Sequence, residues 1–237
     1  MTRRPAPRRP RLARALGTPG LDRARGLSPG TPLHVGEAHG EAPRLRVMTY
    51  GPGTFEEREL SSLEELGPLP DAAVTWLDVD GLHDTALLRA AGDRFDLHPM
   101  LLEDIANTTQ RPKLEVFGDR LFVVCKMLSW DPVAREVRVE QLALLLGAGW
   151  VITFQERPGD VFDPLRDRIR RGAGRVRSMG AAYLAYALLD AVVDGYFGIL
   201  EHVGNALEPL EEQMIREGDP RTVQALHRWR HEILMLR

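Results

Sequence analysis

The stretch from residue 181 to residue 216 constrains the fold most. It contains no proline apart from Pro209, so its pattern favours a single long helix. A bend is allowed near that proline. Gly218-Asp219-Pro220 then ends this helix and starts another, with Asp219 as N-cap and Pro220 at the first helical position. The second helix is still running at Arg237, so we expect a chain that stops inside an element of a longer protein.

The residues before this helical region alternate between strand and helix patterns. Strands are predicted at Leu45–Tyr50, Val74–Val79, Val137–Leu146 and Trp150–Gln155, with two more inside Leu114–Trp130 around Gly118-Asp119. Helices are predicted from an Asp84 cap through Phe95, over Met100–Ala106 after Pro99, and over Pro164–Arg171 with a start near Asp160. This mixture at this spacing is typical of an α/β layered domain.

Charge is unevenly distributed along the chain. Residues 1–25 contain eight Arg and one acidic residue, Asp22, so that segment carries +7 and the remainder carries −10 of an overall −3. The basic arm, residues 1–30, has little apolar periodicity and is predicted to be disordered. It is either an electrostatic contact for anionic lipid or nucleic acid, or a flexible leader without a partner. The acidic body favours cations over nucleic acid as partners.

Two further observations concern the compartment. Cys125 is the only cysteine and lies in an apolar run, which predicts an inert thiol in a reducing cytoplasm. No window carries the roughly 18 uninterrupted apolar residues of a membrane span, and the longest candidate, Leu142–Phe154, contains two glycines. The 237 residues are therefore not expected to cross a membrane by themselves.

The long helix carries an acidic stripe. At 100° per residue its members fall within an arc of about 60°; they are Asp190, Asp194, Glu201, Asn205, Glu208 and Glu212. Such a stripe is either solvated or balanced by cations. Asp190 differs from the others because its sequence neighbours are apolar, which predicts a nearby partner surface and a counter-charge or metal.

Two other patterns contain possible metal ligands. Glu103 and Asp104 are adjacent carboxylates on the short helix after Pro99; they are either helix-favouring charges or hard oxygen ligands for Mg²⁺. His227 and His231 have the i, i+4 spacing of Zn²⁺ ligands, but two arginines crowd them and a plain surface helix is the alternative. Nucleophile elbows, phosphate-binding glycine loops, HExxH and paired CxxC motifs are absent, which argues against an enzyme.

An ordered set of motifs resembles the cytoplasmic domain of the CorA family of Mg²⁺ transporters. The motifs are Pro29-Gly-Thr31, Leu97-His-Pro-Met-Leu-Leu-Glu-Asp-Ile105, Gln110-Arg-Pro-Lys113, Phe154-Gln-Glu156, Val161-Phe-Asp-Pro-Leu-Arg166, Asp167-Arg-Ile-Arg170, and Leu189-Asp-Ala-Val-Val-Asp194 followed by Tyr196-Phe197. Each is weak alone, but their order and spacing hold from about residue 28 to the end.

The resemblance implies an α/β/α layered domain with a mixed sheet over residues 31–178, followed by long C-terminal helices over residues 179–237. It also implies a homopentamer around a pore, with a stalk helix, membrane helices and a Gly-Met-Asn signature that this sequence does not contain. In the family, divalent ions bind between subunits and hold the channel closed. Asp104 then corresponds to the principal regulatory aspartate, Glu103 to its neighbouring ligand and Asp190 to a second-site carboxylate.

The function expected from the resemblance is a cytoplasmic Mg²⁺-sensing domain that gates Mg²⁺ or Co²⁺ uptake at the inner face of the cell membrane. The family pairs its regulatory carboxylates with an acidic residue on the stalk helix, which is missing here, so strong metal binding by the 237 residues alone is not expected. The missing stalk and membrane helices also remove much of the pentamer contact, so we expect these residues to form monomers or dimers. One alternative is a zinc transporter of the same superfamily, which only His227 and His231 favour. Another is a free-standing soluble regulator without a channel.

Overall fold

The computed structural model describes residues 32–36, 42–131 and 136–217, together with positions 223, 226, 227 and 229. A seven-stranded sheet has the order β2-β1-β3-β7-β6-β5-β4. Its β3 and β7 are parallel and all other neighbours antiparallel, so the sheet is mixed. The strands are β1 (Arg44–Tyr50), β2 (Phe55–Leu60), β3 (Val74–Asp80), β4 (Lys113–Phe117), β5 (Arg120–Asp131), β6 (Glu136–Gly147) and β7 (Trp150–Gln155).

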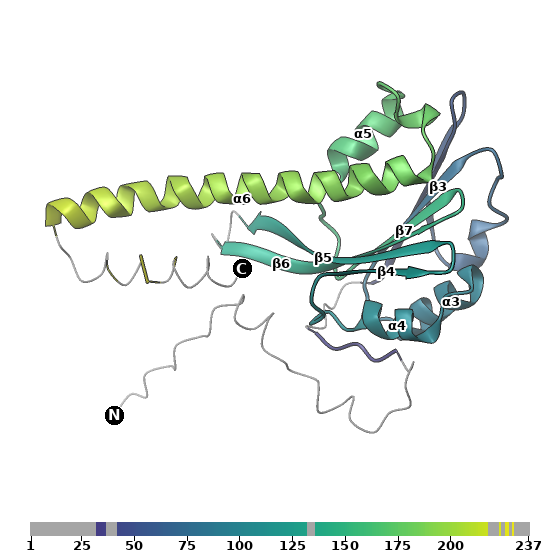
Figure 1. Cartoon of the computed structure of the whole chain (residues 1–237), viewed down its shortest axis with the longest axis horizontal. Helices are drawn as coiled ribbons and strands as arrows, with labels where there is room; N and C mark the ends of the chain where they lie inside the picture. The colour runs from purple at the N-terminus through teal and green to yellow at the C-terminus, as the bar shows by residue number, and fades with distance from the viewer. Residues whose placement is uncertain are drawn as a thin grey trace.

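Helices cover both faces of this sheet, as Figure 1 shows. On one face α3 (Thr85–Phe95) and α4 (Pro99–Ala106) pack through Leu88, Leu101 and Ile105 on the odd-numbered side chains of β3. On the other face α5 (Asp163–Arg171) and α6 (Ala181–Glu217) pack through residues such as Leu165, Leu184 and Leu188. Two short 3-10 turns, η1 (Leu63–Leu66) and η2 (Val176–Ser178), complete the described elements. The result is the α/β/α layering with a mixed sheet that the family resemblance implied.

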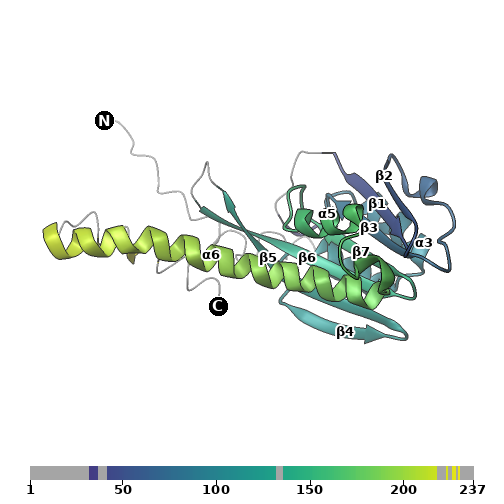
Figure 2. The ribbon, with the colours of Figure 1, turned by 90° about the horizontal axis from the view of Figure 1, so that it is seen from above.

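The sheet and α6 continue together beyond this layered body. The strands β5 and β6 are long and α6 runs along them, as the view from above shows (Figure 2). A separate apolar cluster of Leu128, Val137, Ile199 and Val203 joins them there. Trp130 of β5 stacks on His202 of α6, with ring centroids 5.3 Å apart.

Local chemistry explains several element boundaries. The Asp84 side chain accepts hydrogen bonds from the backbone N–H groups of Ala86 and Leu87, which caps α3. The tight links β4–β5 and β6–β7 place Gly118 and Gly149 at φ 63° and 77°, a left-handed conformation that glycine adopts without strain. The predicted strands, the helix cap and the hairpins are thus confirmed within one or two residues.

Three features differ from the prediction. The sequence did not indicate β2, because four of its six residues are charged; as an edge strand it needs only backbone pairing with β1. The helix expected to start near Asp160 begins at Asp163, since the Asp160 carboxylate accepts a hydrogen bond from the backbone N–H of Phe162 and pairs with Arg166. The basic arm over residues 1–30 and most of the helix expected after Pro220 lie outside the described residues.

The long helix also differs in its membrane character. Among the described residues, Ala181–Arg216 is one helix whose length and composition would suffice to cross a membrane, with a best window of mean hydropathy 1.4 that is 33% buried. The prediction that the chain does not cross a membrane counted uninterrupted apolar runs, and this helix contains none of about 18 residues. Length and composition alone are weak evidence, and Leu184, Leu188 and Val192 of this helix pack on the sheet.

A buried ionic network joins α5 to the centre of the sheet. Arg166 of α5 forms ion pairs with Asp78 of β3 and with Asp160, and all three side chains are at most 5% exposed. Asp78 also accepts hydrogen bonds from Thr153 (2.6 Å) and Gln155 (2.8 Å). Every oxygen of this pair of carboxylates therefore has a donor, which is the condition under which buried charges are tolerated.

We predict that Arg166→Met lowers the free energy of unfolding by about 3–5 kcal/mol, because it leaves two buried carboxylates without their cation. Urea denaturation followed by circular dichroism measures this. Arg171→Met is the matched control on the same helix: its side chain is 75% exposed and its ion-pair partner among the described residues is Asp167, so a loss below about 0.5 kcal/mol is expected. Equal losses in the two variants would contradict the role of the network.

Candidate functional site

The short helix α4 positions Glu103 and Asp104. Its other face is apolar, and Leu101, Leu102 and Ile105 are buried against the sheet. His98 caps the helix by accepting a hydrogen bond from the backbone N–H of Met100, and Pro99 occupies its first turn. Burial of the apolar face orients Glu103 toward solvent and leaves Asp104 at the helix margin, with 17% of its side chain exposed.

Residues from the following loop and strand hold Asp104 in place. Gln110 Nε2 donates to Asp104 Oδ1 at 2.6 Å, and Lys113 Nζ donates to Oδ2 at 2.6 Å. On β6, Gln141 Nε2 donates to the backbone carbonyls of Asp104 and Ile105, both at 3.3 Å. The Gln110-Arg-Pro-Lys113 motif, which entered the sequence analysis only as part of the family resemblance, thus supplies two side-chain partners of Asp104.

Asp190 lies on the exposed face of α6. Its Oδ1 is 3.5 Å from the Tyr186 hydroxyl. The neighbouring side chains Tyr186, Val193 and Phe197 are large, apolar and between 48% and 65% exposed, which fits the prediction of a nearby partner surface. The other members of the acidic stripe, Asp194, Glu201, Asn205, Glu208 and Glu212, are also exposed in the chain.

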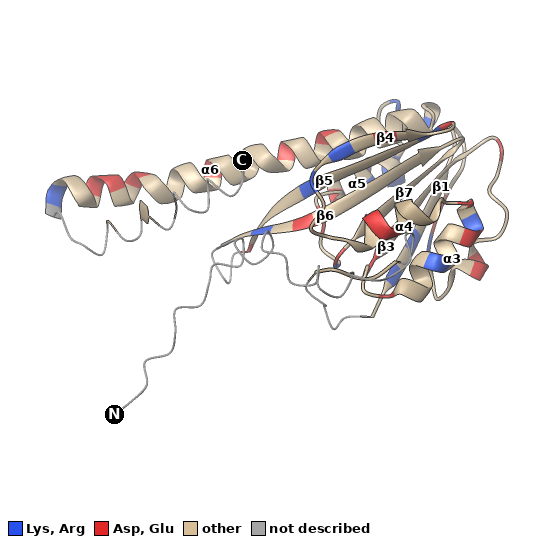
Figure 3. Cartoon of the chain, turned by 60° about the horizontal axis from the view of Figure 1, so that its bottom comes forward, with Lys and Arg blue, Asp and Glu red and all other residues tan. Residues whose placement is uncertain are grey.

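The sheet separates the predicted ligands. Asp104 belongs to α4 in the helix layer formed by α3 and α4, whereas Asp190 belongs to α6 in the opposite layer. Figure 3 shows acidic residues both on α4 and along α6. Across the described parts of the chain, no group of three or more His, Cys, Asp or Glu side chains comes together as a metal site. Glu103 and Asp104 provide the hard oxygen donors that suit Mg²⁺, which accepts one or two carboxylates and keeps waters. These two side chains therefore suit Mg²⁺ chemically, but the described part of one chain supplies only some of the ligands that the ion needs.

A buried acidic group behind the site was not predicted. Glu140 of β6 and Asp80 of β3 are 5% and 8% exposed, and each has one carboxyl oxygen with no hydrogen-bond partner. The nearest cation to Glu140 is Arg157, at 4.0 Å. Burial raises the pKa of Asp80 to about 7 and that of Glu140 to about 8. The sequence did contain a signal for the buried Glu140, since this glutamate occupies an inward-facing position of the predicted strand Val137–Leu146.

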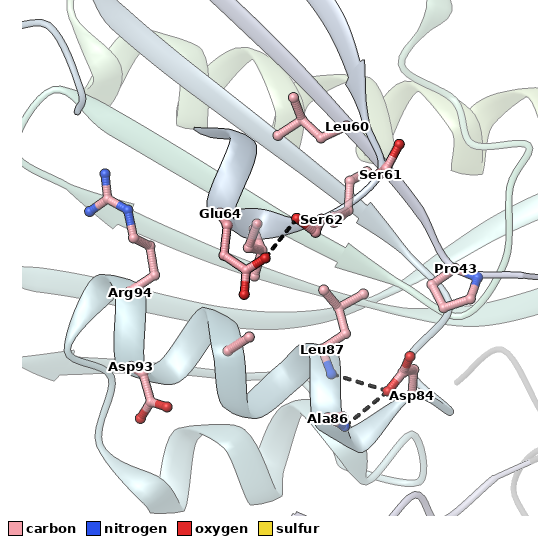
Figure 4. A pocket seen from close by; sticks show the side chains of 13 residues that line it. Pro43, Leu60, Ser61, Ser62, Glu64, Asp84, Ala86, Leu87, Asp93 and Arg94 are labelled. Atoms are coloured by element: carbon pink, nitrogen blue, oxygen red, sulfur yellow. Dashed lines mark hydrogen bonds between the residues drawn. The ribbon is translucent and has the colours of Figure 1, made fainter. Parts of the chain in front are cut away.

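A groove lies between the β2–η1 connection and α3, with an accessible volume of about 730 Å³ (Figure 4). Three of its polar side chains are engaged with the protein. Ser62 Oγ donates to Glu64 at 3.1 Å, Asp84 caps α3, and Arg94 donates to the backbone carbonyl of Gly67.

The two possible zinc ligands are only partly covered by the structure. His227 is exposed, and His231 lies outside the described residues.

Comparison with known proteins gives one consistent result. Residues 71–237 match the family model described as a CorA-like Mg²⁺ transporter protein. The chain is 38% identical over 218 residues to the cobalt/magnesium transport protein CorA of Thermotoga maritima, covering 92% of this chain and 62% of that protein. It thus spans less than two thirds of that relative.

Solved structures share the fold. The full-length CmaX protein matches with a TM-score of 0.65 at 19% identity, covering 85% of this chain and 61% of that one. The soluble domain of CorA from Methanocaldococcus jannaschii matches with a TM-score of 0.62 at 15% identity, covering 80% and 72%.

The raised pKa of Glu140 predicts a pH-dependent stability. The folded state keeps the proton up to about pH 8, whereas the unfolded chain releases it near the ordinary value of 4.5, so stability falls as pH rises through that window. We expect Glu140→Gln to be about 2–4 kcal/mol more stable than the wild type at pH 8.5 and to differ little at pH 4.5. Urea unfolding at both pH values tests this. The exposed Glu211→Gln is the control, and a Glu140→Gln variant that follows the wild-type pH profile would contradict it.

Proposed function

This chain belongs to the CorA family of Mg²⁺ transporter proteins, and on that premise we propose that it is the Mg²⁺-sensing cytoplasmic part of a magnesium and cobalt transporter. The regulatory ligands in this proposal are Asp104, Glu103 and Asp190. The single observation that carries it is the pair of carboxylates on α4, of which Asp104 is held at the helix margin by Gln110 and Lys113 of the motif that follows.

The separation of the ligands supports a site between copies. One chain holds Asp104 and Asp190 in opposite layers, so a cation that uses both must take them from two copies. The exposed apolar side chains around Asp190 give such a contact a surface to form on. We extend the proposal to the homopentamer, in which membrane segments outside this chain carry the ions.

The mechanism follows from electrostatics. Carboxylates of facing copies repel each other when no cation lies between them. A bound Mg²⁺ supplies two positive charges, so it bridges these groups and stabilises the closed arrangement of subunits. When internal Mg²⁺ falls, repulsion favours a splayed arrangement and ion uptake resumes. This is a population shift driven by the different affinities of two assemblies for the same ion.

The other assignments belong to the same proposal. The layered domain is placed over residues 31–178 and the helical region over residues 179–237, on the cytoplasmic face of the membrane. The zinc alternative still depends on His227 and His231. The soluble-regulator alternative predicts that no transport accompanies expression of the full-length protein.

The regulatory role predicts a loss of inhibition in the transporter. Asp104→Asn keeps the shape of the side chain but removes its charge, so we expect the internal Mg²⁺ concentration for half-inhibition of uptake to rise about tenfold, the effect of losing about 1.4 kcal/mol of binding. Uptake into vesicles loaded with graded Mg²⁺ measures this.

The control is Asp119→Asn in the β4–β5 turn, whose side chain is 82% exposed. It removes the same charge away from α4 and should leave the inhibition curve in place. If uptake by the Asp104→Asn protein is inhibited by internal Mg²⁺ as strongly as uptake by the wild type, the proposed function is wrong.

A further inference from the structure

Both carboxylate oxygens of Asp104 already have donors within the chain. Gln110 occupies Oδ1 and Lys113 occupies Oδ2, each at 2.6 Å. The Lys113 contact is an ion pair in which the two side chains are only 25% and 17% exposed, so it is poorly screened by solvent. A divalent cation that reaches Asp104 therefore meets a site whose charge is already neutralised.

Lys113 carries an ammonium group, whereas nearly all other basic side chains of this chain are arginines, which carry a guanidinium group. Only two of the 31 basic residues are lysines, Lys113 and Lys126. The fixed ion pairs of the fold, at Arg166 and Arg170, use the rigid fork of arginine. The lysine ammonium is a compact point charge on a flexible stem, which can leave a carboxylate without breaking a two-point contact.

Lys113 has a second acidic partner when it leaves Asp104. Glu115, two residues along β4 and on the same face of the strand, has its Oε1 3.2 Å from Lys113 Nζ and is 40% exposed. The ammonium also lies 5.6 Å from the centroid of the Phe122 ring, within cation–π range. Although burial alone would lower the pKa of Lys113, its hydrogen bonds to these carboxylates raise it, so the group stays charged in either position.

We propose that Lys113 is a tethered counter-cation that competes with the divalent ion for Asp104 and moves to Glu115 when the ion binds. This inference rests on the proposed function, because it concerns the same carboxylate. The apparent affinity for the ion is then the intrinsic affinity multiplied by the fraction of time that Asp104 is free of Lys113. An ammonium that occupies Asp104 for about nine tenths of the time weakens binding about tenfold. The lysine thus sets the Mg²⁺ concentration at which the site responds.

The test is Mg²⁺ binding to the full-length protein by isothermal titration calorimetry at constant ionic strength, because the proposed site takes its ligands from two copies. Lys113→Met keeps the apolar stem over Phe122 and removes the charge, and we expect Mg²⁺ affinity to rise about three- to tenfold. Glu115→Gln removes the second partner and should lower affinity about twofold. Lys126→Met is the matched control: Lys126 Nζ donates to the backbone carbonyl of Thr108 rather than to Asp104, so affinity should stay within about twofold of wild type.

A second measurement follows the lysine itself. Lysine-specific ¹³C and ¹⁵N labelling gives signals from two residues, and the Lys113→Met spectrum assigns them. Addition of Mg²⁺ should shift the Lys113 side-chain signals and leave those of Lys126 in place. Unchanged Lys113 signals at saturating Mg²⁺ would overturn the inference.

The outcomes separate the inference from the function on which it rests. If Asp104→Asn abolishes binding while Lys113→Met leaves it equal or weaker, Lys113 positions Asp104 rather than competing for it, and the Mg²⁺ site stands. If Asp104→Asn binds Mg²⁺ as the wild type does, the proposed site itself fails. If neither the full-length wild type nor its Lys113→Met variant binds Mg²⁺, the proposed site and the inference both fail.

Discussion

A sheet buried on both faces keeps the carboxylates of α4 and α6 apart, and the rest of the account depends on that separation. Both layers are anchored by apolar side chains that alternate along the same strands, so neither helix can move to the other side without losing its core. The pairing of Arg166 with Asp78 and Asp160 fixes α5 against the same sheet. A cation that joins Asp104 to Asp190 must therefore join two molecules, and cation binding becomes coupled to assembly.

The same separation explains why Asp104 has a partner inside its own chain. A carboxylate at the margin of a buried helix needs donors, and Gln110 and Lys113 supply them. These contacts satisfy Asp104 within the chain. Under the proposed function the same two hydrogen bonds would compete with the cation, which would link the stability of the single subunit to its sensitivity to the ion.

The sequence predicted the fold well where a local rule applies. Apolar periodicity and turn residues located six of the seven strands and α3, α4, α5 and α6, because burial of one face dictates that pattern. It missed β2, because the charged residues of this edge strand give no apolar pattern. It also missed the Arg166 network, because Asp78 of β3 lies far in sequence from Asp160 and Arg166. The site residues came from resemblance. Their separation by the sheet and the Lys113 contact were not predicted, because both depend on tertiary placement.

A crystal structure of the full-length protein grown with Co²⁺, with anomalous scattering used to locate the ion, tests the central claim most directly. The account predicts a Co²⁺ ion beside Asp104, completed by a carboxylate of a neighbouring copy, with the Lys113 ammonium turned to Glu115. An ion bound elsewhere, while Lys113 remains paired with Asp104 in every copy, would contradict it.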